Sequence, residues 1–190
     1  QVAANIMFIA PTFGISSDSR LDTGPKLNLY TALMMASMIS HGATAIRDAT
    51  VLDIGAETGI LSRLALRIGA RRAIQLEKNE LALKVPEQLL LHDDCFNGTD
   101  TRSRTTLKWG DITEDSTFQS LLEDPMVQEA TVGLLNMGPW PEYGRAYGRA
   151  LDLLYLLPNI RLVINGGFLL GFAGHDRTYR DDAERFIRRG

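Results

Sequence analysis

The sequence predicts an α/β fold, a doubly wound and mostly parallel sheet flanked by helices. Short apolar runs alternate with stretches of helical periodicity along the chain, which is typical of βαβ units. A glycine-bearing turn at 55–59 joins one such run directly to one such helix. The chain has 190 residues, the length of one domain. We expect a single domain with residues 46–190 as its core and residues 1–45 as an appendage.

Composition and charge exclude several classes of protein. The chain is 45% hydrophobic and 23% charged, as globular proteins are. The net charge of −3 and the small basic cluster near residue 188 give no strong nucleic-acid signature. The single cysteine excludes an internal disulfide and a Cys-rich zinc site, and we expect no metal. Without a membrane span or signal peptide pattern, we expect a cytoplasmic protein with no membrane partner; the oligomeric state stays open.

The N-terminal region predicts a strand and then a helix. The apolar run Ile6–Ala10 fits a strand. A helix is expected from Pro25 to the pair His41–Gly42, because apolar residues recur at helical spacing at Leu27, Tyr30, Met34 and Met38.

The centre of the chain has the clearest pattern. Residues 50–54 form a short apolar strand, the turn 55–59 follows, and apolar residues then recur at helical spacing from residue 60 until Gly69 closes the helix. A second strand is expected at 73–77, and it ends on an acid.

The remaining elements continue the alternation. Strands are expected at 106–109, at 132–135 and within 161–172, and helices at 80–92, around 118–122, at 147–155 and at 181–189. Pro86 is expected to kink or restart its helix, because proline lacks a backbone N–H. The glycines at 166–167 leave a bulge and a hairpin equally open for the last strand.

The glycine spacing in the turn distinguishes between two kinds of cofactor. The dinucleotide pattern G-x-G-x-x-G, counted from Gly55, fails at Glu57 and Ile60. The pattern Asp-x-Gly-x-Gly-x-Gly is met by Asp53, Gly55 and Gly59 and fails only at Glu57. This turn resembles that of the class I S-adenosylmethionine (SAM) methyltransferases, which have a Rossmann-like fold. The stretch 51–80 is most similar to the ribosomal-protein lysine methyltransferases and their relatives.

The resemblance implies a SAM site built from several successive strand ends. Glu77 would bind the ribose hydroxyls, Asp111 would lie near the adenine amine, and the loop from Asn136 would receive the methyl acceptor. The cofactor-binding residues implied are Asp53, Gly55, Ala56, Glu57, Gly59, Glu77, Lys78, Gly110, Asp111 and Asn136.

Elementary chemistry agrees with this placement. Ligands of parallel α/β sheets bind beyond the carboxyl ends of the strands, where these acids fall. A carboxylate such as Glu77 only accepts hydrogen bonds, which suits a diol that donates two. The free N–H groups at the start of the helix near Gly59 suit the methionine carboxylate.

The acceptor loop implies nitrogen methylation. The family's loop reads Asn-Pro-Pro-aromatic, and this chain has Asn136-Met137-Gly138-Pro139-Trp140. Asn136 would orient the acceptor nitrogen and Trp140 would stack on it, which makes these two residues the catalytic candidates. The acceptor is a protein or a small molecule.

Two other readings of the sequence remain. Glu57 and the unusual acceptor loop are compatible with a non-catalytic SAM- or nucleoside-binding module. An NAD-dependent oxidoreductase is disfavoured by the failed glycine spacing. The family's sheet has seven strands, of which five are clear here; either the chain is truncated, or Ile6–Ala10 occupies part of that edge.

Overall fold

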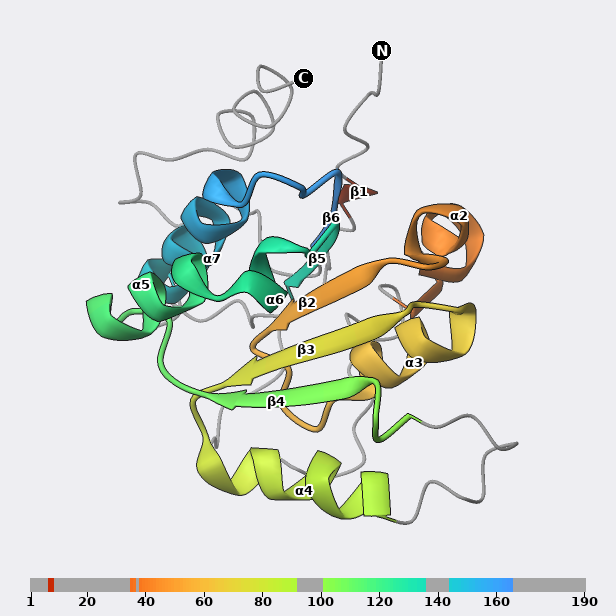
Figure 1. Cartoon of the computed structure of the whole chain (residues 1–190), viewed down its shortest axis with the longest axis horizontal. Coiled ribbons are helices and arrows are strands. Elements are labelled where there is room, and N and C mark those ends of the chain that lie inside the picture. Colours follow the sequence, from red (N-terminus) through yellow and green to blue (C-terminus); the bar gives the residue numbers. More distant parts are fainter. Residues whose placement is uncertain (1–6, 9–34, 37, 92–100, 136–143, 166–190) are drawn as a thin grey trace.

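The computed structural model describes residues 7–8, 35–36, 38–91, 101–135 and 144–165 (Figure 1). Its strands are β1 Met7–Phe8, β2 Thr50–Ile54, β3 Arg72–Glu77, β4 Thr105–Trp109, β5 Val132–Leu135 and β6 Leu162–Asn165. Its helices are the π-helix η1 Met38–Gly42 and the α-helices α2 Ala43–Ile46, α3 Ile60–Ile68, α4 Glu80–Leu91, α5 Asp115–Glu123, α6 Pro125–Gln128 and α7 Gly144–Leu156.

The six strands form one sheet in the order β1-β6-β5-β2-β3-β4, and all their pairings are parallel. From β2 the chain first builds outward through β3 and β4, and then returns to add β5 and β6 on the other side of β2. The reversal falls between β2 and β5, and ligands of such sheets bind beyond the carboxyl ends of the strands at this point.

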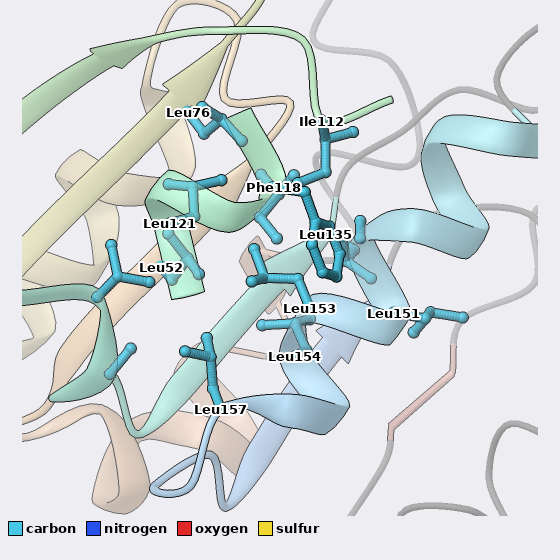
Figure 2. Close-up of a cluster of buried hydrophobic side chains, with 14 of the residues drawn as sticks. Leu52, Leu76, Ile112, Phe118, Leu121, Leu135, Leu151, Leu153, Leu154 and Leu157 are labelled. Atoms are coloured by element: carbon cyan, nitrogen blue, oxygen red, sulfur yellow. The ribbon is translucent and has the colours of Figure 1, made fainter. Parts of the chain in front are cut away.

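Both faces of the sheet are covered, because the side chains of each strand alternate between the faces. Leu52 and Ile54 pack with apolar residues of α5, α6 and α7 in one cluster (Figure 2). Val51, on the opposite face, packs in a second cluster with residues of η1, α2 and α3. Figure 1 shows these two groups of helices on opposite sides of the sheet. The doubly wound parallel architecture predicted from the sequence is confirmed.

The N-terminal run contributes a strand at the edge of the sheet. Met7 and Phe8 pair in parallel with Ile164 and Asn165 of β6. The hypothesis that Ile6–Ala10 occupies part of this edge is therefore confirmed for the two residues that the structure describes. The division into a core and an appendage stays a prediction.

One helix prediction was wrong, and of the two alternatives for Pro86 only the restart is contradicted. The first helix was expected to end at His41–Gly42, but helical structure continues through η1 into α2, which ends at Ile46 with Arg47 as its C-cap. Ile46 explains the extension, because its fully buried side chain packs in the second apolar cluster, with residues of η1 and α3. At Pro86 the helix α4 neither ends nor restarts; it stays one element from Glu80 to Leu91 and contacts β3 and β4.

The sequence analysis missed the short helix α6. The Asp124 carboxylate caps this helix by accepting hydrogen bonds from the backbone N–H groups of Met126 at 2.8 Å and Val127 at 3.3 Å. Pro125 occupies its first turn. An Asp-Pro pair is a recognised helix start and could have revealed the element.

Several predictions concern residues outside the described ranges. These are the helix between residues 25 and 34, the acceptor loop at 136–140, the end of the run 161–172 and the helix at 181–189. Among the helices that are described, none has the length and apolar character needed to cross a membrane.

Candidate functional site

The turn between β2 and α3 is hydrogen-bonded to the end of β3. The backbone N–H groups of Gly55 and Ala56 both donate to the carbonyl of Leu76, at 2.9 Å and 3.1 Å. Gly55, Glu57 and Gly59 all have left-handed φ angles, of 74°, 47° and 71°. Two of these three positions hold glycine, which adopts such angles without a steric penalty. The third position, in the middle of the turn, holds Glu57.

Glu77 lies beside the turn at the carboxyl end of β3. One carboxylate oxygen accepts a hydrogen bond from the Glu57 backbone N–H at 2.9 Å, and the other accepts from the Asn79 backbone N–H at 2.8 Å. The residue is 7% exposed. Each carboxylate oxygen offers about two acceptor sites, so Glu77 retains capacity for a ligand that donates hydrogen bonds.

Asp53 lies fully buried at the end of β2, close to the turn. The Ser62 hydroxyl of α3 donates to its Oδ2 at 2.6 Å, whereas Oδ1 has no hydrogen-bond partner among the described residues. Burial raises the pKa of Asp53 to about 7; the Ser62 hydrogen bonds lower it, and repulsion from Glu77 and Glu57 adds to the rise. An unpartnered buried carboxylate oxygen marks a place where a donor is missing.

Gln75 is a polar residue of this region that the sequence analysis did not select. It is the register partner of Asp53 on β3 and is fully buried, and within the described part of the chain neither polar atom of its amide has a hydrogen-bond partner. Its amide lies against Gly59, where a Cβ atom would come within 2.5 Å of Gln75 Oε1. The signal was a lone polar residue inside the otherwise apolar strand 73–76.

Asp111 follows β4 and holds the next loop in place. Its Oδ1 accepts hydrogen bonds from the Thr113 backbone N–H at 2.8 Å and from the Thr113 hydroxyl at 2.7 Å. Lys78 Nζ lies 3.9 Å from its Oδ2. Desolvation alone would raise the pKa of Asp111, but these hydrogen bonds and the charges of Lys78 and Arg145 lower it.

Backbone contacts bring the ends of β3 and β4 together. The Gly110 N–H donates to the Glu77 carbonyl at 3.1 Å, and the Trp109 indole N–H donates to the Lys78 carbonyl at 3.0 Å. A side chain at Gly110 would be crowded, since a Cβ there would lie 2.8 Å from Thr117 Cγ2. Trp109 is 69% exposed and was not among the predicted site residues.

The start of α3 also faces this site. The helix begins at Ile60, and Gly59 precedes it without a side-chain cap. The first-turn N–H groups of a helix lack partners within the helix, so they suit an anionic group of a ligand.

The structure thus brings together most of the predicted cofactor residues at adjacent strand ends. Asp53, Glu57 and Glu77 surround the turn, and Lys78 and Asp111 lie together at the ends of β3 and β4. Asn136 and Trp140 lie outside the described residues, so their predicted roles remain predictions. Within the described ranges, His, Cys, Asp and Glu side chains form no group that could hold a metal ion.

The doubly wound parallel sheet, with its glycine turn and its acids at the strand ends, is the fold of the class I SAM-dependent methyltransferases. Two solved structures share it. The methyltransferase domain of a bacterial protein, CtHen1, has a TM-score of 0.52 at 13% identity and covers 72% of this chain and 65% of its own. A provisionally assigned methylase from Haemophilus influenzae has a TM-score of 0.50 at 19% identity and covers 70% of this chain and 73% of its own.

The curated relatives are also methyltransferases, although each match is partial. Ribosomal RNA small subunit methyltransferase A of Rhodopseudomonas palustris is 37% identical over 65 residues, which is 34% of this chain and 23% of the relative. Ribosomal protein L11 methyltransferase of Sorangium cellulosum is 33% identical over 79 residues, 42% of this chain and 23% of the relative. The matched part thus spans about a quarter of each relative. No family model matches the chain.

Proposed function

We propose that this protein is a SAM-dependent methyltransferase that transfers the methyl group to a nitrogen of its acceptor. One observation carries the cofactor assignment: the unpartnered, fully buried Oδ1 of Asp53 lies at the end of β2, beside a glycine turn that is fastened to Glu77. SAM, when bound, supplies an activated methyl group, so the protein's contribution is mainly binding and orientation.

The residues present fit this cofactor chemically. Glu77 and Asp53 accept hydrogen bonds, as a ribose diol and an ammonium group require of their partners. The uncapped first turn of α3 supplies N–H groups for a carboxylate. The loop at Gly110–Asp111 would hold the adenine, with Lys78 beside it. Asn136 and Trp140 would orient the acceptor nitrogen and exclude water from it.

For the acceptor, we propose a nitrogen of a protein or small molecule. The names of the relatives add ribosomal RNA as an acceptor to be tested against ribosomal protein. Labelled methyl transfer from SAM to each of these, with Asn136→Ala and Trp140→Ala as variants, would distinguish them. Transfer to a carbon or oxygen atom in the labelled product would contradict the nitrogen assignment.

The cofactor is tested by calorimetric titration of SAM into the wild-type chain and into Asp53→Ala and Glu77→Ala. Micromolar binding that both substitutions weaken is expected. Glu123→Ala serves as the matched control, because Glu123 is exposed at the last position of α5. Absence of SAM binding by the folded wild type would contradict the proposal. SAM binding without transfer to any acceptor would instead favour a non-catalytic binding module.

A further inference from the structure

Three carboxyl groups surround the turn at 55–59. Asp53 lies at the end of β2, Glu57 occupies the middle of the turn, and Glu77 binds the Glu57 N–H. Desolvation and repulsion from Glu77 both raise the pKa of Glu57. Glu77 therefore lies close enough to Asp53 and Glu57 to destabilise their charged forms.

No positive side chain compensates this cluster in the part of the chain that the structure describes. The ion pairs there join other residues, such as Lys78 with Asp111, and none includes Asp53, Glu57 or Glu77. A separate observation points to a missing ligand, since Oδ1 of Asp53 is buried and no described residue hydrogen-bonds to it. Above about pH 7, where Asp53 is ionised, like charges held together without counter-charge favour the binding of a cation.

We infer that Asp53, Glu57 and Glu77 form a charge-selective site, with Glu57 as the specificity-determining residue, that binds SAM more tightly than the demethylated product S-adenosylhomocysteine. This inference rests on the proposed function. The two molecules differ by one methyl group and one positive charge: SAM carries a sulfonium, and the product carries a neutral thioether. Their ammonium, carboxylate, ribose and adenine are the same, so negative charge near the sulfur discriminates between them.

Glu57 is the residue best placed to supply this selectivity. Its φ of 47° is left-handed, a conformation that disfavours any residue except glycine. The hydrogen bond from its N–H to Glu77 holds the backbone in that conformation. Its carboxylate, by contrast, makes no hydrogen bond or ion pair within the described residues, and the residue is exposed. A bound cation would offset the repulsion from Glu77.

The consequence is an asymmetry between substrate and product. At an effective dielectric constant of 20, one carboxylate about 12 Å from a positive charge changes binding by about tenfold, and a closer one by more. Methyl transfer removes the positive charge from the sulfur. The affinity of the site for the product is therefore lower than its affinity for SAM. Glycine at position 57 would bind the two molecules more equally.

The test is calorimetric measurement of the dissociation constants of SAM and S-adenosylhomocysteine at low and at high salt. For the wild type, we expect SAM to bind about tenfold more tightly than S-adenosylhomocysteine at low salt. The ratio of the two dissociation constants should be smaller at high salt. Glu57→Gln should weaken SAM binding about tenfold and change product binding less than about twofold. Glu57→Gly, which also removes the charge, should act in the same direction. Glu123→Gln, which removes an exposed acid from α5, should leave both constants unchanged.

The possible failures are distinguishable. If the folded wild type binds no SAM, both the proposed function and this inference are overturned. If SAM binds but the wild type holds the product equally tightly, only the inference fails. The inference also fails if Glu57→Gln and Glu57→Gly weaken the binding of SAM and of S-adenosylhomocysteine to the same extent, because a merely structural role of Glu57 predicts that result.

Discussion

The carboxylate of Glu77 accepts a hydrogen bond from the backbone N–H of Glu57 at 2.9 Å, across 20 positions of sequence. Glu77, which is predicted to bind the ribose, therefore also stabilises the turn. Its second oxygen accepts from the Asn79 N–H, so one side chain holds the ends of two loops. The geometry of the site and the stability of the turn thus depend on the same group.

Removal of this carboxylate should destabilise the fold even without cofactor. Glu77→Ala leaves two backbone N–H groups without their charged acceptor, and we expect a loss of roughly 2–4 kcal/mol in the free energy of unfolding. Glu77→Gln keeps one acceptor oxygen and should lose less. Urea denaturation of the cofactor-free protein measures both. Equal stability of wild type and Glu77→Ala would show that these bonds contribute nothing.

Replacement of Glu57 by glycine should relieve strain. Glycine adopts the left-handed region freely, although it increases the entropy of the unfolded chain. We expect Glu57→Gly to stabilise the fold by about 0.5–1 kcal/mol. Asp48 is the matched control, because it is the other described non-glycine residue with a positive φ, at 61°, and lies on the loop before β2. Asp48→Gly should give a smaller gain in thermal stability, because aspartate adopts the left-handed region more readily than glutamate, and should leave SAM affinity unchanged.

A side chain at Gly59 should be costly. The Cβ atom of Gly59→Ala would come within 2.5 Å of Gln75 Oε1, and its φ of 71° is left-handed. We expect a loss of roughly 2–4 kcal/mol. In a Gln75→Ala background the steric part of this loss should disappear and the backbone part should persist. A double-mutant cycle with no coupling between positions 59 and 75 would contradict the contact.

The stability of the protein should depend on the ionisation of Asp53. The pKa of this group is about 7 in the folded protein, against an ordinary value of 3.8. The folded state therefore holds a proton that the unfolded state has lost, and stability should fall as the pH rises from about 4 to about 7, with no further fall from this group above that. The loss amounts to no more than about 4 kcal/mol.

Asp53→Asn should flatten this dependence, because an amide does not titrate and its oxygen can still accept from the Ser62 hydroxyl. Denaturation midpoints measured at intervals between pH 4 and pH 8 would show the difference. A wild type and an Asp53→Asn variant with parallel pH profiles would contradict a buried, proton-holding Asp53.

Much of the fold was predictable because its signals are local. The strand at 50–54, the turn at 55–59 and the helix closed by Gly69 agree with the structure, since apolar periodicity and glycine positions report on neighbouring residues. The errors occurred where tertiary packing overrode a local rule. Burial of Ile46 extends the first helix beyond Gly42, and contacts with β3 and β4 accompany a helix that continues through Pro86.

The sequence by itself determined the architecture and the identity of the acids at the strand ends, because alternating patterns and motif spacing are properties of the chain alone. Only the tertiary structure decided how those acids relate to one another. It placed the Gln75 amide against Gly59 and left Oδ1 of Asp53 without a partner among the residues described. It also joined the Glu57 N–H to Glu77 by a hydrogen bond, with Glu57 in a left-handed conformation. These features arise where β2 and β3 lie side by side, and burial and charge proximity depend on which distant residues the fold brings together.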